Sequence, residues 1–217
     1  MKLRRLKTGN ISSLSPLEGS EVWLWGTDCT YGDLYEAQEL YQDHHRIVSN
    51  RLIFVNRIDG RVYEPVEEKP GQYFGKPISD ENLIMILTAD FTAGVIRILS
   101  FDPQSGRIES VCEIARTQIK DCYNLMMHKE PLMLTRAESE CFEIIWPLSK
   151  RYSVSAHESF CFRKDDSLYF SRWEEDPDYR EETVVRDLSA GEIKEVINAS
   201  LVMSDDGQWW MLERNEE

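Results

Sequence analysis

The sequence predicts an all-β fold made of repeated units. Its strand-like runs are short, turn residues separate them, and one turn pattern recurs around the chain. In that pattern a strand-like run ends in a turn, and Gly-x-Ile or Gly-x-Val opens the next run. It occurs at Gly9, Gly60, Gly106 and Gly191, with a degenerate copy at 148–152. With that copy counted at its middle residue, the intervals are 51, 46, 44 and 41 residues, and 35 residues lead from Gly191 through both termini to Gly9. Near-equal spacing that closes across the termini indicates a circular repeat.

Each unit is predicted to contain four strands, and the repeated turn joins the last two. The third unit has predicted strands at 121–127, 131–136, 141–148 and 151–154, and the fourth at 159–163, 167–173, 182–188 and 192–197. The C-terminus supplies only the first half of a further unit, at 200–204 and 208–214. Its second half would come from the N-terminus, at 2–7 and 10–14, so that no sheet edge stays unpaired.

One segment, 31–45, breaks the strand pattern and predicts a short amphipathic helix. Asp33 stands where an N-cap would, and Glu36 follows three residues later, as in a capping box. Apolar side chains recur at helical spacing at Leu34, Ala37 and Tyr41. We expect an insertion between the first and second strands of the first unit, which would explain the longest interval. A second irregular stretch, 174–182, is acidic and is expected to form an exposed loop.

At about 43 residues and four strands per unit, the chain resembles β-propeller repeat proteins in general. It has neither the Trp-Asp dipeptide nor the Gly-His opening of WD40 repeats, so the resemblance assigns no family and carries over no functional residue. It implies a single domain over 1–217, a five-bladed β-propeller closed by the N- and C-terminal strands, with one short helical insertion. A β-sandwich with evenly spaced hairpins is the alternative fold.

The composition is that of a globular protein with a large negative charge. The formal net charge of −14 disfavours nucleic acid and anionic membranes as partners, because both attract basic patches. The longest apolar run, 83–87, is too short to span a membrane, and no secretory signal is readable at 2–13. We expect a cytoplasmic monomer with reduced thiols, since the cysteines are odd in number and form no Cys-x-x-Cys pair: Cys29, Cys112, Cys122, Cys141 and Cys161.

No motif in the sequence predicts catalysis or a cofactor. The paired histidines His44 and His45 could bind a metal, but adjacent side chains diverge, and a helix C-terminus is an alternative use for them. No Gly-x-Ser-x-Gly or phosphate-binding glycine loop is present. Acids at the mouth of a propeller channel could serve a glycan-active or metal-dependent hydrolase, for which the candidates are Asp90, Glu143 and Asp205.

Aromatic residues carry the remaining functional signal, because exposed rings bind protein partners and stack on sugars. Packing between sheets is the alternative use of these rings. We expect a non-enzymatic module that binds a protein partner, a small ligand or a glycan on one loop-decorated face. The alternatives are the hydrolase and an acidic, antitoxin-like inhibitor of a basic partner. The candidate binding residues surround the predicted helix and the closing unit: Trp23, Trp25, Tyr31, Tyr35, Tyr41, His44, His45 and Trp209.

Overall fold

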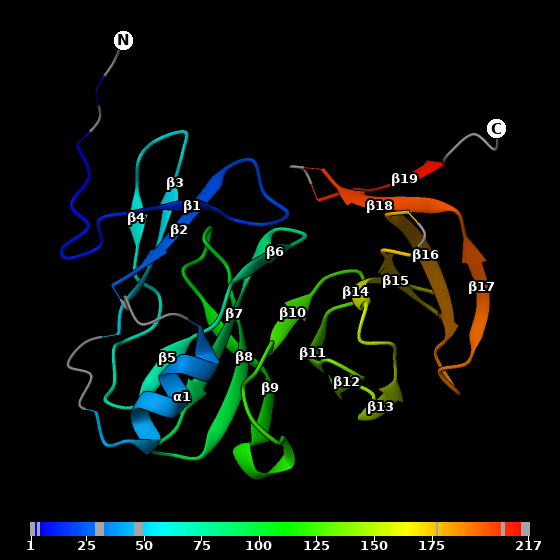
Figure 1. The fold of residues 1–217 in the computed structure, drawn as a ribbon. Helices are drawn as coiled ribbons and strands as arrows, with labels where there is room; N and C mark the ends of the chain where they lie inside the picture. The colour runs from blue at the N-terminus through cyan, green and yellow to red at the C-terminus, as the bar shows by residue number, and fades with distance from the viewer. Residues whose placement is uncertain are drawn as a thin grey trace. The chain divides into compact units, whose positions relative to one another are not determined.

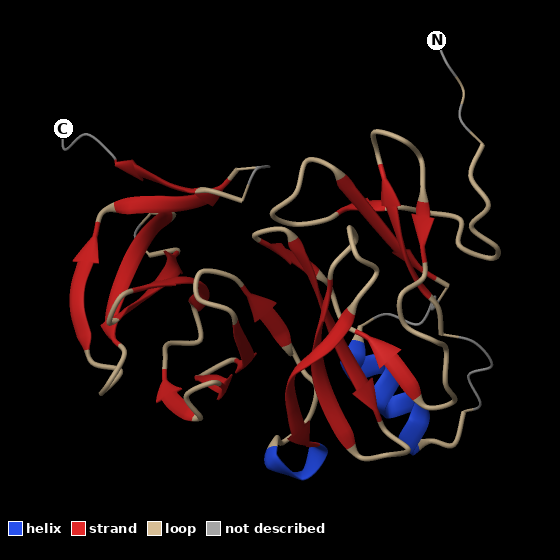
Figure 2. Cartoon of the chain, turned by 180° about the vertical axis from the view of Figure 1, so that it is seen from behind, coloured by secondary structure: helices blue, strands red, loops and turns tan. Residues whose placement is uncertain are grey.

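Figure 1 shows the fold in a computed structural model, which describes residue 3 and residues 5–28, 33–45, 50–176, 178–204 and 207–213. The described chain consists mainly of strands in several antiparallel sheets (Figure 2), so the predicted all-β class is confirmed. It divides into two compact parts, Met1–Met127 and His128–Glu217, which are described separately. From here on, these two parts, and not the predicted repeats, are called the first and the second unit. The single domain over 1–217 stays a prediction. Within the described residues, no helix is both long and apolar enough to cross a bilayer.

The first unit contains two antiparallel sheets. One has the order β1-β2-β3-β4, and the other has the order β5-β7-β8-β9, with β6 also paired to β7. Phe54 of the first sheet stacks on Phe101 of the second, with ring centroids 6.3 Å apart, in a buried apolar cluster that also contains Leu52 and Ile86. The strands are β1 (Ser15–Pro16), β2 (Trp23–Thr27), β3 (Leu52–Asn56), β4 (Val62–Tyr63), β5 (Gln72–Phe74), β6 (Ile78–Asp80), β7 (Leu83–Asp90), β8 (Val95–Phe101) and β9 (Ile108–Ala115); a 3₁₀ turn, Arg116–Gln118, follows.

The second unit contains two four-stranded sheets and a two-stranded one, with the orders β10-β11-β12-β13, β14-β15-β16-β17 and β18-β19. Phe142 of the first sheet packs against Phe160 and Phe170 of the second, with centroids 4.4 and 5.3 Å away. The boundary between the units falls within β10. The strands are β10 (Met126–His128), β11 (Met133–Glu138), β12 (Cys141–Trp146), β13 (Lys150–Ser153), β14 (Glu158–Lys164), β15 (Ser167–Glu174), β16 (Arg180–Asp187), β17 (Ile193–Ile197), β18 (Ala199–Met203) and β19 (Trp209–Glu213).

The repeated glycine turn joins the third and fourth strands of a sheet, as predicted. At Gly60, Gly106 and Gly191 the φ angle is positive, and each glycine N–H donates to the carbonyl four residues earlier. That earlier residue carries a second signal, because its side chain accepts backbone N–H groups within the turn. It is Asn56, Asp102 or Asp187. The motif is therefore Asx-x-x-x-Gly, in which the side chain organises the turn and glycine supplies the left-handed conformation.

Two copies of the turn differ from this motif. In the degenerate copy, which joins β12 to β13, the residue with positive φ is Ser149 (51°), one position before the expected residue. At Gly9 the φ angle is 64°, and Ile11 N donates to the Thr8 carbonyl, but the described residues on both sides lie outside strands. Ile11 is instead buried against Ile53 and Val55 of β3. Local turn chemistry is thus retained where the neighbouring strands are not formed.

The inserted helix is present as α1 (Leu34–Gln42), but it follows the second strand rather than the first. It connects β2 to β3, which corrects the predicted position. The Asp33 side chain caps it by accepting from Tyr35 N and Glu36 N at 2.9 and 3.1 Å. At the other end His44 takes a φ of 59°, and the N–H groups of His44 and His45 donate to the carbonyls of Tyr41 and Leu40. This is a Schellman ending with histidine in the position that glycine usually occupies.

Three further expectations change. The strand predicted at 121–127 begins only at Met126, since Tyr123 N and Leu125 N are used in turns.

The acidic loop predicted at 174–182 is shorter, because β15 and β16 continue until Glu174 pairs with Arg180. Cross-strand attraction between Arg172 and Glu182 (2.5 Å) favours that extension. The predicted strands 2–7 and 10–14 are not observed in the described residues, and β18-β19 is a two-stranded sheet.

Candidate functional site

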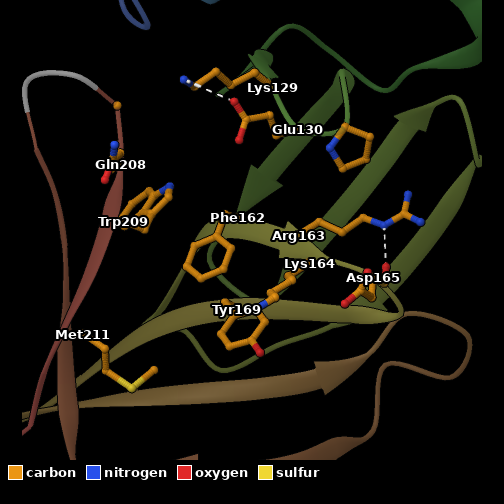
Figure 3. A pocket seen from close by; sticks show the side chains of 12 residues that line it. Lys129, Glu130, Phe162, Arg163, Lys164, Asp165, Tyr169, Gln208, Trp209 and Met211 are labelled. Atoms are coloured by element: carbon orange, nitrogen blue, oxygen red, sulfur yellow. Dashed lines mark hydrogen bonds and ion pairs between the residues drawn. The ribbon is translucent and has the colours of Figure 1, made fainter.

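An open pocket of about 840 Å³ lies in the second unit (Figure 3). Three chain segments meet there: the turn between β10 and β11, the end of the β14–β15 hairpin, and the start of β19. Rings and charged side chains face each other across it. We call it the aromatic pocket; its lining residues are Lys129, Glu130, Pro131, Phe162, Arg163, Lys164, Asp165, Tyr169, Gly207, Gln208, Trp209 and Met211.

A β-bulge turns Phe162 toward this pocket. Strand alternation alone would place Phe160 and Phe162 on the same face of β14. Phe160 pairs with Phe170, but Phe162 pairs with Tyr169, so Cys161 is an extra residue between the two pairs. Phe160 therefore faces the core with Phe170, whereas Phe162 and Tyr169 share the opposite face. Burial raises the pKa of the Cys161 thiol to about 11, which favours its protonated form at neutral pH.

Three rings form a continuous ladder along one wall of the aromatic pocket. Phe162 and Tyr169 stack with centroids 4.5 Å apart and planes 10° from parallel. Trp209 packs on Phe162 at 5.4 Å, with the planes 32° apart. The adjacent Trp210 points away from them: it is 57% exposed, and its indole N–H donates to the Ser204 hydroxyl at 3.2 Å. The prediction that the two tryptophans face opposite sides of the strand is confirmed.

The charged groups of the aromatic pocket are mostly cationic. Lys129 lies 3.6 Å from the Glu130 carboxylate, so these two charges largely offset each other. The Arg163 Nε donates to the Asp165 carbonyl at 3.0 Å, which holds Arg163 against the hairpin turn. In the described residues, no hydrogen bond or ion pair holds the Lys164 ammonium, and this side chain extends toward the Phe162–Tyr169 pair (Figure 3). A positive charge in a negatively charged protein is thus left beside the stacked rings.

The predicted binding residues fall into separate places. Trp209 lines the aromatic pocket, whereas Trp23 and Trp25 line two cavities of the first unit, of about 670 and 290 Å³. Trp23 also packs edge-on against Tyr63 at 5.4 Å. The buried indole nitrogen of Trp25 has no hydrogen-bond partner in the described part of the chain, and the smaller cavity also contains Leu34 from the start of α1.

The residues predicted on the helix are used largely to hold that helix in place. Tyr35 packs edge-on against Tyr123 at 5.3 Å, and a hydrogen bond with Glu39 raises the pKa of the Tyr35 hydroxyl. Tyr41 contacts Phe91 at 5.5 Å. The exposed His44 and His45 form the helix ending described above, while Tyr31 lies outside the described residues. The binding role of these residues stays a prediction.

Two of the three acids considered for hydrolysis have local partners. Asp90 accepts from Ala93 N at 2.8 Å in the turn after β7, and Glu143 is bound by the fully buried Arg136 at 3.1 Å. Asp205 lies outside the described residues. No group of three or more histidine, cysteine or acidic side chains suited to a metal ion occurs among the described residues.

Comparison with known proteins gives similarities of fold only. No protein-family model matches the chain, and no curated protein matches it. Among solved structures it is similar to an acylaminoacyl peptidase, with 12% identity and a TM-score of 0.49 over 94% of this chain and 36% of that one. The dipeptidyl peptidase 4 of Porphyromonas gingivalis shares 9% identity, with a TM-score of 0.45 over 90% of this chain and 32% of that one.

A third similar structure is itself a propeller. The β-propeller domain of the Trilobed protease from Pyrococcus furiosus shares 10% identity, with a TM-score of 0.46 over 99% of this chain and 66% of that one. The chain thus spans about a third of the length of the two peptidases and slightly less than two thirds of the propeller chain.

Proposed function

We propose that this chain is a non-enzymatic binding module that holds a small ligand, or a segment of a protein partner, in the aromatic pocket. The observation that carries this proposal is the ladder of Tyr169, Phe162 and Trp209, reached by a bulge that takes Phe162 out of the core. Bulges often re-aim a side chain next to a functional site, and aromatic walls with a few charged groups are typical of ligand pockets.

In this proposal the scaffold is a five-bladed propeller closed by its two termini. Its support is the repeated Asx-x-x-x-Gly turn, which joins the third and fourth strands in three of the sheets, and the two-stranded β18-β19 sheet, which lacks the outer half of a blade. The segment 2–7 is basic and offers exposed leucines, with Leu3 79% accessible to solvent. Trp210 and Leu212 of β19 are also exposed, so strand addition would cover apolar surface on both segments.

Deleting residues 2–8 tests the closure. If 2–7 pairs with β19, the deletion should lower the melting temperature and increase hydrogen exchange of the β19 amides. A second variant replaces Leu3 and Leu6 with serine in the full-length chain. It keeps the backbone and the charge and removes only the apolar contact, so it separates the contribution of the leucines from that of strand pairing. If the truncated protein kept the same melting temperature and the same hydrogen exchange of the β19 amides, a blade shared by the two termini would be ruled out.

Binding at the aromatic pocket can be tested with ¹⁹F NMR on protein labelled with 5-fluorotryptophan. The Trp209 resonance is assigned from a Trp209→Phe variant, and a fragment library containing neutral, acidic, basic and sugar-like compounds is then titrated. We expect bound fragments to shift Trp209 in the parent protein, and to bind more weakly to Trp209→Ala when the fragment's own NMR signals are observed. The matched control is Trp210→Ala, which removes the neighbouring indole from the other face of β19. Fragments that shift only Trp23 or Trp25, or none that shift Trp209, would contradict the proposal.

A further inference from the structure

Phe162 joins the rings of the aromatic pocket into one apolar wall. Phe162 lies between Tyr169 and Trp209, and it is the one ring that contacts Trp209 within the described residues. Pro131 and Met211 add apolar surface to the same pocket. Aromatic pairs favour offset or edge-to-face contacts, and a methionine sulfur adds a favourable contact at a ring edge. A flat ring in the aromatic pocket could therefore pack against Phe162 and Trp209 and contact further apolar atoms.

The polar groups beside these rings are mainly hydrogen-bond donors. Lysine and arginine side chains donate hydrogen bonds and accept none, and three of them line the pocket. Of the two carboxylates, Glu130 is paired with Lys129, and Asp165 lies with Arg163 at the hairpin turn, away from Trp209 (Figure 3). Lys164 stands between that turn and the rings. Lys164 is exposed, and its complement is an acceptor group with a negative charge, because an ammonium attracts such a group even where solvent screens part of the interaction.

We infer that the ligand of the aromatic pocket is an aromatic ring that carries an anionic group, with the ring against Trp209 and Phe162 and the anion at Lys164. This inference rests on the proposed binding function and specifies its ligand class. A neutral sugar fits less well, because it would leave the Lys164 ammonium without a charged partner. The same chemistry has two sources: a free aromatic acid, or an aromatic residue at the C-terminus of a peptide.

Four probes separate the ring from the charge. N-acetylphenylalanine has both, its amide keeps only the ring, and N-acetylalanine keeps only the carboxylate. The tetrapeptide Gly-Gly-Gly-Phe presents the same acid at the end of a peptide. Each probe is titrated against the 5-fluorotryptophan protein, with the Trp209 resonance as readout, at low and high salt. The variants are Lys164→Gln, which removes the charge at the site, and Lys69→Gln, which removes one exposed lysine of the first unit as a net-charge control.

We expect N-acetylphenylalanine to bind about two- to fivefold more tightly than its amide, with the preference weakening as salt rises. Lys164→Gln should reduce the ratio to about one while both ring probes still bind, and Lys69→Gln should leave the ratio unchanged. N-acetylalanine should not shift Trp209. Tighter binding of the tetrapeptide than of N-acetylphenylalanine would identify a peptide C-terminus as the source, and equal or weaker binding a free acid.

Two results would overturn the ligand class: equal affinity for the acid and the amide, or a preference that survives Lys164→Gln. Its failure can be told apart from failure of the binding function. If neutral fragments shift Trp209 and no aromatic acid does, the aromatic pocket still binds ligands and only the class is wrong. If neither the library nor the acids shift Trp209, both proposals fall.

Discussion

Gly106 and Gly191 occupy the same position of the same kind of turn. We nevertheless expect substitution by alanine to lower the free energy of unfolding much more at Gly191 than at Gly106. Their φ angles are 74° and 77°. Alanine in this region costs about 1–2 kcal/mol, offset by about 0.5–1 kcal/mol because glycine loses more backbone entropy on folding. Around Gly106 an added methyl group meets no atom within 4 Å. Gly106→Ala should therefore lower the free energy of unfolding by only about 1 kcal/mol.

At Gly191 the added Cβ would lie 2.6 Å from the Tyr152 Cδ1 atom. That ring cannot easily move aside, because Tyr152 is 5% exposed and its hydroxyl donates to the Leu188 carbonyl at 2.7 Å. It also stacks on Phe142. Overpacking a rigid core typically adds about 1–3 kcal/mol, so Gly191→Ala should cost about 2–4 kcal/mol in all. For a protein of this size that lowers the Tm by about 5–15 °C.

Urea denaturation followed by tryptophan fluorescence measures both variants, and a Tyr152→Leu background isolates the clash. Without the ring, Gly191→Ala should cost about 1 kcal/mol, as at Gly106. Equal costs for Gly106→Ala and Gly191→Ala in the parent protein would refute the reasoning. So would a cost of Gly191→Ala that Tyr152→Leu leaves unchanged, because the penalty would then not come from contact with the ring.

Three further predictions concern stability. The side chain of Glu158 is 1% exposed and accepts two hydrogen bonds from Arg186, of 2.8 and 2.9 Å. Glu158→Ala should therefore lower the free energy of unfolding, measured in urea, by about 3–5 kcal/mol, because it leaves the buried Arg186 cation without a partner. The double variant Glu158→Ala with Arg186→Met should lower it clearly less. Equal losses in the two proteins would contradict this explanation. His44→Gly should raise the free energy of unfolding by about 0.5–1 kcal/mol, because glycine adopts the left-handed conformation at the helix end without strain. A lower Tm would contradict this. Burial raises the pKa of Tyr152 to about 12 from about 10, so its contribution to stability is complete below pH 10 and is lost as the pH rises toward 12. Tyr152→Phe should flatten the alkaline fall of Tm over that window, and an identical fall in both proteins would show that Tyr152 does not titrate there.

Much of the strand pattern was predictable because its signals are local. The turn requires a positive φ angle at Gly60, Gly106 and Gly191, which glycine adopts readily. All three turns join the third and fourth strands of their sheets. The Asp33 cap located the start of α1 within one residue, since capping depends on neighbouring backbone groups. The connection that carries the helix was assigned one strand too early. Strand order depends on pairing between distant segments such as β2 and β3, which periodicity does not encode.

The candidate site was only partly predictable. Trp209 was selected because adjacent tryptophans on a strand must face opposite sides. Phe162 was missed, since alternation places it with Phe160 in the core and nothing in the local sequence announces an extra residue at Cys161. Lys164 was missed because one lysine among many surface charges has no distinguishing neighbour in the sequence. Tyr41 was also selected as a binding residue; its ring contacts Phe91, and its binding role stays a prediction.

By itself the sequence determined the all-β class, the glycine corners and the capped helix, because each depends on backbone preferences within about five residues. Only the tertiary structure decided which rings meet. Phe162 reaches Trp209 through a register shift between β14 and β15, and the cost of alanine at Gly191 depends on Tyr152 from another sheet. Such contacts join residues tens of positions apart. They are settled by how whole sheets pack, because core atoms at close-packed density leave each side chain few places to go.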